Sequence, residues 1–311
     1  MSEAVSLLLV DASIYLFRAF FSLPKRWHDE AGNATHAVLG FTRALLDAQQ
    51  RLAPTHIVVA FDASLTNCFR NQILPSYKAQ RPQPDPDIIR QQAECVRSCE
   101  QLGWFHCADE RYEADDLLAS ALRQWRAMHP DAPAWLMTRD KDFGQLLLEP
   151  GTRVWNDSVH FGAREFTRRY GVQPAAFPDY QALVGDASDN VPGVSGVGPK
   201  TAAQLIGRFE SLETLYEQIE QVRAGHTPVR RPEHVARDLL AQQQQAFAMR
   251  EILRLYTQCS VVDSLEQLRP RSPDVDVQTE FYKRLGLSQS LRLPGARPMS
   301  SLPVASEGDD L

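Results

Sequence analysis

Three short apolar runs, each leading to an aspartate, shape the first half of the chain. Residues 5–10, 56–61 and 134–138 have the length and composition of buried strands, and residues 152–155 those of a short edge strand. Amphipathic stretches separate these runs. Alternating strands and helices predict an α/β fold with a doubly wound, mostly parallel sheet. The expected helices cover 12–21, 35–52, 87–103 and 114–128.

The second half of the chain has a different pattern, because strand signals stop after about residue 170 and helical spacing takes over. We therefore expect an α/β domain over 1–172 and a helical region over 173–287. Residues 288–311, rich in Pro, Ser, Gly and acidic side chains, predict a disordered tail. Residues 63–86 hold four prolines and several basic residues, which is typical of a lid or threading loop. The helices expected in the second half cover 177–184, 200–209, 211–221 and 233–256.

Nine carboxylates follow the predicted strands or open the neighbouring segments. Because the carboxyl ends of parallel strands meet at one edge of a sheet, these side chains should gather there. So much negative charge is costly unless cations neutralise it, and oxygen-only ligands favour hard ions such as Mg²⁺ or Mn²⁺. One acidic pair alone could serve a turn or a helix terminus, but the whole set predicts a two-metal site. The nine are Asp11, Asp62, Glu113, Asp115, Asp116, Asp140, Asp142, Asp186 and Asp189.

The formal charge of −6 does not exclude a nucleic-acid partner, because removing the nine carboxylates would leave +3. The five cysteines show no zinc-site spacing and are expected to be reduced thiols. The N-terminus lacks the basic region of a signal peptide, and no apolar run approaches the ~18 residues of a membrane span. These features predict a cytoplasmic protein.

A glycine-rich segment, 193–201, joins two expected helices and predicts a helix-hairpin-helix (helix-three-turn-helix) element. The amides of Gly198, Lys200 and Thr201 at the following helix start could bind phosphates, and Lys200 adds charge. The segment follows a helix and lacks the glycine-lysine order of a Walker loop. A simple glycine-rich turn is the alternative.

The basic segment offers a second way to hold a phosphate. Lys78 and Arg81 would share one helical face and could grip a scissile phosphate, while Tyr77 could stack on a base. Arg18, one turn after Asp11, would also face the metals. A solvated basic loop and a surface ion pair are the respective alternatives.

In these motifs the chain resembles the bacterial 5′-nuclease family, the 5′→3′ exonuclease and flap endonuclease domain attached to DNA polymerase I and its stand-alone relatives. The absence of a polymerase-length extension favours the stand-alone members. One departure is Arg139, where relatives usually carry glycine. The matching stretches are Leu9-Val10-Asp11, Tyr15–Ala19, Phe61-Asp62, Phe69-Arg70, Tyr77-Lys78, Arg81-Pro82, Glu113–Asp116, Asp140–Asp142, Gly185–Asn190 and Gly193–Ala202.

The resemblance implies a role for each site residue. Lys78 and Arg81 would lie in a helical arch over the active site and act in catalysis with Asp115 and Asp140. Asp11, Asp62, Glu113, Asp115 and Asp116 would hold the first metal ion or hydrogen-bond to its waters, and Asp140, Asp142, Asp186 and Asp189 would hold the second. A K⁺ ion would bind main-chain carbonyls of Leu183, Val184, Pro192, Val194 and Val197. DNA would contact Arg18, Arg70, Tyr77, Lys78, Arg81, Gly196, Val197, Gly198, Pro199, Lys200 and Thr201.

The expected function is therefore a Mg²⁺- or Mn²⁺-dependent 5′→3′ exonuclease and 5′ flap endonuclease, acting in primer removal or repair. We expect a monomer at the bacterial nucleoid whose partners are DNA with 5′ ends, flaps or overhangs, together with RNA–DNA primer hybrids, and no membrane. The alternatives are a non-catalytic structure-specific DNA-binding factor, which loss of carboxylates would favour, and a metal-dependent ribonuclease, which would not need the hairpin.

Overall fold

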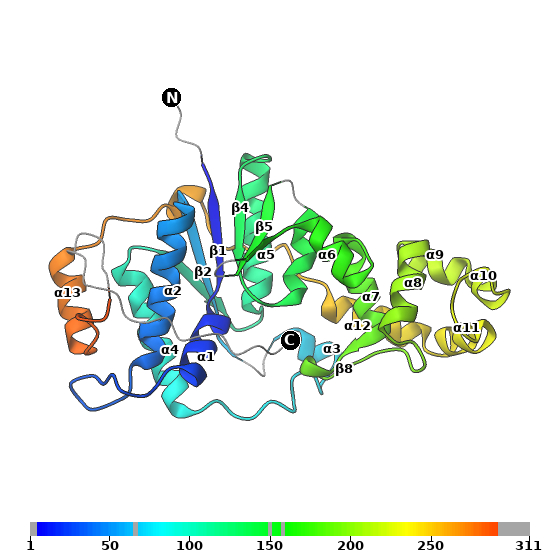
Figure 1. The fold of residues 1–311 in the computed structure, drawn as a ribbon, viewed down its shortest axis with the longest axis horizontal. Helices are drawn as coiled ribbons and strands as arrows, with labels where there is room; N and C mark the ends of the chain where they lie inside the picture. Colours follow the sequence, from blue (N-terminus) through cyan, green and yellow to red (C-terminus); the bar gives the residue numbers. More distant parts are fainter. Residues whose placement is uncertain (1–4, 65–67, 149–150, 157–158, 292–311) are drawn as a thin grey trace.

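The computed structural model describes residues 5–64, 68–148, 151–156 and 159–291 (Figure 1). A six-stranded sheet in the order β3-β2-β1-β4-β5-β6 forms the centre of its first part. The first five strands are parallel, and β6 runs antiparallel to β5, so the predicted α/β class is confirmed. The strands are β1 (Leu7–Asp11), β2 (His56–Asp62), β3 (Phe105–Asp109), β4 (Ala134–Met137), β5 (Thr152–Asn156) and β6 (Val159–Phe161).

Helices cover both faces of the central strands. Leu8 and Val10 of β1 pack into one hydrophobic cluster with α1, α2 and α4, and Leu7 and Leu9 pack into a second cluster with α5. A strand buried on both faces is a continuous apolar run, which is why the sequence pattern located β1, β2 and β4. These helices are α1 (Ala12–Ser22), α2 (His36–Leu52), α4 (Pro86–Gln101) and α5 (Ala114–Met128).

Two strands of the six-stranded sheet were not predicted from the sequence pattern. β3 reads Phe-His-Cys-Ala-Asp and is only half-buried at the sheet edge, so it contains no apolar run. β6 has three residues and pairs outside β5, so β5 is not the edge strand that we expected. Short edge strands carry a weak signal because water replaces a packed neighbour on one side.

The second part of the chain is helical, and α8 to α11 project from one end of the molecule (Figure 1). The helix expected over 233–256 is divided at Gln242, whose side-chain oxygen accepts a hydrogen bond from the Ser195 amide at 2.9 Å. The helix expected over 211–221 is likewise two helices. The helices are α6 (Ala163–Tyr170), α7 (Phe177–Val184), α8 (Pro199–Phe209), α9 (Leu212–Glu217), α10 (Ile219–Arg223), α11 (Pro232–Ala241) and α12 (Gln243–Leu253).

Several short elements connect these layers. They are α3 (Arg70–Ile73), the two-stranded β7 (Gly185–Asp186) and β8 (Val191–Pro192), and the 3₁₀ helices η1 (Lys141–Leu148), η2 (Pro174–Ala176), η3 (Ala187–Asp189) and η4 (Leu265–Leu268).

The sheet and the helical region share one core. The hydrophobic cluster that contains Leu7 and Leu9 continues through α5 into α7, α8 and α12. After α12 the chain returns to the opposite end, where α13 (Val275–Arg284) lies near α4 (Figure 1). No described helix is long and apolar enough to cross a membrane.

The end of the described chain is anchored to the first domain. Thr35 Oγ1 donates to the Leu285 carbonyl at 2.9 Å, and Trp27 Nε1 donates to Ser290 Oγ at 2.9 Å. Residues 288–291, which we had placed in the tail, therefore belong to this contact. The rest of the expected tail, 292–311, lies outside the described residues.

Candidate active site

The carboxyl ends of β1 and β2 bring Asp11 and Asp62 to one edge of the sheet. Thr138, just after β4, donates to Asp11 Oδ2 at 3.0 Å. Asp62 accepts from the Ala114 amide at 2.9 Å and from the Ser13 hydroxyl at 2.7 Å, so it joins the starts of α5 and α1. The strand order changes direction between β1 and β4, which is the usual place for a ligand crevice in open α/β sheets.

The start of α5 supplies three further carboxylates with different environments. Glu113 is the N-cap, and its amide donates to Asp116 Oδ2 at 3.2 Å in a capping box. Asp115 lines the cleft beside Asp11 and Asp62. Asp116 is fully buried. The helix start therefore presents Asp115 to the cleft and uses Asp116 to hold the turn.

Arg70 explains why Asp116 is buried. Its two terminal nitrogens lie 2.6 and 2.8 Å from the two Asp116 oxygens, and its Nε donates to the Ile252 carbonyl at 2.7 Å. Arg70 Nη1 is also 2.9 Å from Glu113 Oε2. We expected Arg70 at the DNA and Asp116 at the first metal ion, but the structure makes them a buried ion pair between α3, α5 and the end of α12.

The second group of carboxylates comes from segments far apart in the sequence. Ligand oxygens of Asp142, Asp186 and Asp189 lie within 4.8 Å of one another. Gln181 of α7 donates to Asp142 Oδ1 at 2.7 Å. Lys141 Nζ lies 2.6 Å from Asp186 Oδ2. Gln181 was not expected at the site, and Lys141 was expected only as part of the Asp140–Asp142 stretch, without a role, although its position between two expected ligands was a usable signal.

Crowding of like charges changes the acidity of this site. Burial, followed by repulsion from Asp62 and Asp140, raises the pKa of Asp11 to about 7. Burial and repulsion from Asp140 also raise the pKa of Asp142 to about 7. Burial is the largest cause of the raised pKa of Asp115 as well. The cluster carries more negative charge than its own cations balance, and its oxygen-only donors suit hard divalent ions.

The basic segment lies directly on this cluster. Lys78 Nζ bonds to Glu113 Oε1 and lies 3.9 Å from Asp189 Oδ2, and Arg81 Nη2 lies 2.5 Å from Asp189 Oδ1. Burial raises the pKa of Glu113, but Lys78 and Arg70 outweigh it and leave the pKa lowered. Tyr77 is buried and donates to Glu113 Oε2 at 2.9 Å, so its ring does not lie where a base could stack.

A cleft of about 550 Å³ is lined by acidic and basic members of this site. Its charged lining includes Asp11, Asp62, Asp115, Asp140, Asp189, Lys78 and Arg81. Its apolar lining includes Ile14, Phe17, Phe21 and Ile88. Arg18 does not line this cleft, and its guanidinium lies 4.8 Å from the Tyr15 ring centre.

The glycine-rich segment forms the expected hairpin before α8. Gly196, Gly198, Pro199 and Lys200 are exposed there, whereas the Val197 side chain is buried. The hairpin follows β8 in the chain and leads into α8, and the β7–β8 pair before it carries Asp186 (Figure 1).

The carbonyl positions expected for K⁺ are brought together at the base of the hairpin. The Val194 amide donates to the Leu183 carbonyl at 2.8 Å, and the Val197 amide donates to the Val194 carbonyl at 3.0 Å. A Cβ on Gly193 would lie 2.4 Å from the Val184 carbonyl, so glycine permits this close approach.

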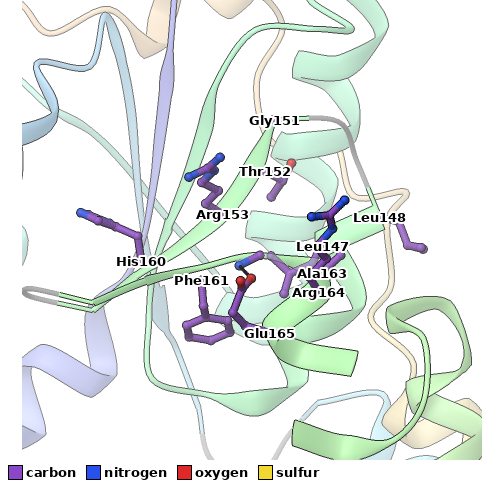
Figure 2. A pocket seen from close by; sticks show the side chains of 11 residues that line it. Leu147, Leu148, Gly151, Thr152, Arg153, His160, Phe161, Ala163, Arg164 and Glu165 are labelled. Carbon is purple, nitrogen blue, oxygen red and sulfur yellow. Dashed lines mark hydrogen bonds between the residues drawn. The ribbon is translucent and has the colours of Figure 1, made fainter. Parts of the chain in front are cut away.

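Two other hollows lie beyond the cleft. Figure 2 shows one of about 510 Å³ between η1, β5, β6 and α6, with Arg153, His160, Arg164 and Glu165 around it and none of the nine carboxylates. A third, of about 410 Å³, borders Asp140 and Lys141 and is also lined by Arg139. Arg139 is therefore an exposed neighbour of Asp140, in the second set of carboxylates.

Two family profiles match consecutive parts of the chain. Residues 6–171 match the 5′-3′ exonuclease N-terminal resolvase-like domain, and residues 172–276 match the 5′-3′ exonuclease C-terminal SAM fold. DNA polymerase I of Lactococcus lactis strain IL1403 is 33% identical over 293 residues, which cover 91% of this chain and 32% of that protein. DNA polymerase I of Mycobacterium tuberculosis is 36% identical over 225 residues, covering 70% and 24%. The chain spans about a third of the length of the first such relatives.

Solved structures share the fold. The T5 D15 protein co-crystallised with metal ions superposes with a TM-score of 0.67 at 18% identity, covering 90% of this chain and 98% of that one. The catalytic core of Rad2 in complex with DNA substrate superposes with a TM-score of 0.58 at 16% identity, covering 91% and 88%.

Proposed function

Because the chain belongs to the 5′-3′ exonuclease family, which is a family of nucleases, we propose that it hydrolyses DNA phosphodiester bonds at 5′ ends and 5′ flaps with the help of divalent metal ions. The observation that carries this proposal is the gathering of strand-end and helix-start carboxylates in one cleft. Burial and mutual repulsion raise the pKa values of Asp11 and Asp142 in this acidic cluster to about 7, so divalent cations bound there would relieve the repulsion.

The donors suit two ions in neighbouring positions. Bound there, Mg²⁺ or Mn²⁺ would supply Lewis-acid assistance to the attack of water on phosphorus and to the departure of the 3′ oxygen. In this proposal Asp116 acts through Glu113 and the turn that it caps, because Arg70 occupies both of its oxygens. The first position would be held by Asp11, Asp62, Glu113 and Asp115, and the second by Asp140, Asp142, Asp186 and Asp189.

The basic side chains over the cleft would position the scissile phosphate. Lys78 and Arg81 are bonded to Glu113 and Asp189, so they already stand at the carboxylates that the metals would bind. With these carboxylates engaged by metal ions, Lys78 and Arg81 would be available to the phosphate, whose charge redistributes in the transition state. Their predicted catalytic role rests on this exchange of partners.

The hairpin would hold duplex DNA through backbone amides and Lys200, and such phosphate contacts position the protein without reading bases. We propose that residues 1–172 form the catalytic domain, and that 173–287 hold the duplex, with K⁺ at the hairpin carbonyls, and also supply Asp186 and Asp189 to the second metal position. A monomer acting on flaps and on RNA–DNA primer hybrids in replication or repair completes the proposal. The DNA polymerase I relatives and the DNA complex of Rad2 support a DNA substrate.

A labelled flap tests the function directly. A duplex with a 5′-labelled single-stranded flap is incubated with the protein in Mg²⁺ or in EDTA, and the products are sized. Short labelled products that need Mg²⁺ are expected. Tight binding without products would favour the non-catalytic DNA-binding alternative, and cleavage restricted to RNA strands would favour the ribonuclease alternative.

A further inference from the structure

The ammonium of Lys141 lies among the second set of carboxylates, which contains Asp142, Asp186 and Asp189. Its Nζ lies 2.6 Å from Asp186 Oδ2 and 3.6 Å from Asp142 Oδ1. These two carboxylates and Asp189 have oxygens within 4.8 Å of one another, which is the spacing of ligands to one shared ion. The chain therefore supplies a positive charge of its own where a divalent cation would bind.

The carboxylates around Lys141 are held in place by other partners. Asp186 Oδ1 accepts from the Ser188 amide at 2.9 Å, and Gln181 donates to Asp142 at 2.7 Å. The Asp142 amide donates to Asp140 Oδ1 at 2.8 Å. These bonds do not need the lysine, so the oxygens would keep their places if the ammonium left.

The lysine has room to leave. Its side chain is 38% exposed, whereas those of Asp142 and Asp186 are 12% and 6% exposed. It also borders the hollow of about 410 Å³ that is lined by Asn156 and Tyr170. A flexible four-carbon stem can swing into this space at the cost of its two ion pairs.

We propose that Lys141 is an intramolecular competitor for the second metal position, and that displacement of its ammonium sets the affinity of this position for Mg²⁺. The inference rests on the proposed metal-dependent function. Because metal binds only the fraction of molecules in which the ammonium has moved away, the observed affinity is lower than the carboxylates alone would give. Lys141 pairs with Asp186 and Asp142 of the second position, whereas the lysine bonded to the first position is Lys78, through Glu113, so removal of Lys141 should leave the first position unchanged.

The test compares K141M with the wild type and with K283M as a matched control. Lys283 pairs with Glu280 at 3.4 Å on α13, and both side chains are about two-thirds exposed. Metal-free proteins are titrated with Mg²⁺ by calorimetry without DNA, and their thermal unfolding is followed in EDTA. For K141M we expect roughly tenfold tighter binding at the weaker site, an unchanged tighter site, and a lower unfolding temperature without metal than K283M.

A second variant separates charge from packing. K141R keeps the positive charge and should keep the weak affinity of the wild type. An equal gain in both variants, or an unchanged weaker site in K141M, would overturn the competition. If the wild type binds no Mg²⁺ at all, the proposed metal-dependent function itself fails.

Discussion

Arg70 joins three segments of the chain through one buried guanidinium. It pairs with Asp116 on α5 and donates to the carbonyl of Ile252 at the end of α12. The Tyr256 amide also donates to Asp116, at 2.8 Å. The pair therefore fixes the helix start that presents Asp115 to the cleft.

Removing this guanidinium should be costly. Arg70→Ala would leave Asp116 buried without its counter-ion, so we expect a loss of about 3–5 kcal/mol in the free energy of unfolding, measured in urea. Arg51→Ala is the control, because the Arg51–Asp47 side chains are 56% and 43% exposed and such pairs contribute ~0–1 kcal/mol. Equal losses in the two variants would show that Arg70 is not a structural link.

Asp115→Asn should abolish cleavage while DNA binding remains nearly unchanged. The carboxylate lines the cleft and is proposed to hold a metal ion, whereas phosphate affinity comes mainly from basic groups and amides. Single-turnover rates at saturating Mg²⁺ and dissociation constants in Ca²⁺ separate the two effects. Near wild-type turnover would refute the metal assignment.

The carboxylate set could be predicted at this scale because most of the acids follow a strand or open a helix, and Asp186 and Asp189 stand together in a short acidic loop segment. The internal partners could not. Arg70 and Asp116 are 46 positions apart, and their pairing depends on how α3 meets α5 and α12. Arg70 and Tyr77 were therefore expected at the DNA, because basic and aromatic residues in a segment without regular structure are typical of a nucleic-acid contact.

At the scale of elements, η1 carries Lys141 and Asp142 and packs closely against α6. A Cβ on Gly144 would lie 2.0 Å from Phe166 Cε2. Gly144→Ala should therefore destabilise the fold by about 1–3 kcal/mol and reduce stabilisation by Mg²⁺, both read from thermal unfolding with and without metal. Gly207→Ala in α8 is the control, since the nearest atom is at 3.4 Å.

The hairpin and α8 act as one binding element in the proposed function. Lys200→Ala should weaken binding to any duplex and reduce the slope of log K against log salt by about one, because one phosphate contact is lost. Lys283→Ala on α13 should leave the slope unchanged. A normal slope with a collapsed single-turnover rate would instead assign Lys200 to the catalytic centre.

Elements buried on both faces could be predicted from sequence, and those at edges could not. β1, β2, β4 and α5 have apolar patterns that match their surroundings. β3 and β6 lie at the two edges of the sheet, and α13 lies at the periphery and buries only Gln278 and Tyr282. The break at Gln242 has no proline or glycine to mark it, and it depends on a contact with the hairpin.

At the scale of the molecule, the chain ends by packing against the domain where it began. Leu287 is fully buried in the cluster that contains α1, α2 and α4. Leu287→Ala should lower the free energy of unfolding by about 2–5 kcal/mol in chemical denaturation. We expect this loss although Leu287 comes long after the cleft-lining residues in the sequence. Val277→Ala, at an exposed site on α13, should change stability by ~0.5 kcal/mol or less. A small effect at Leu287 would show that this end of the chain folds separately.

The hydrophobic cluster shared by β1 and α8 has a consequence for where a strand is cut. Packed side chains join the cleft to the hairpin, so the distance between these two sites is fixed by the core. If the hairpin grips a duplex as proposed, the number of nucleotides between the gripped phosphate and the broken bond is set by the interior of the protein. Core substitutions that weaken this packing should therefore make the product lengths heterogeneous before they lower the cleavage rate.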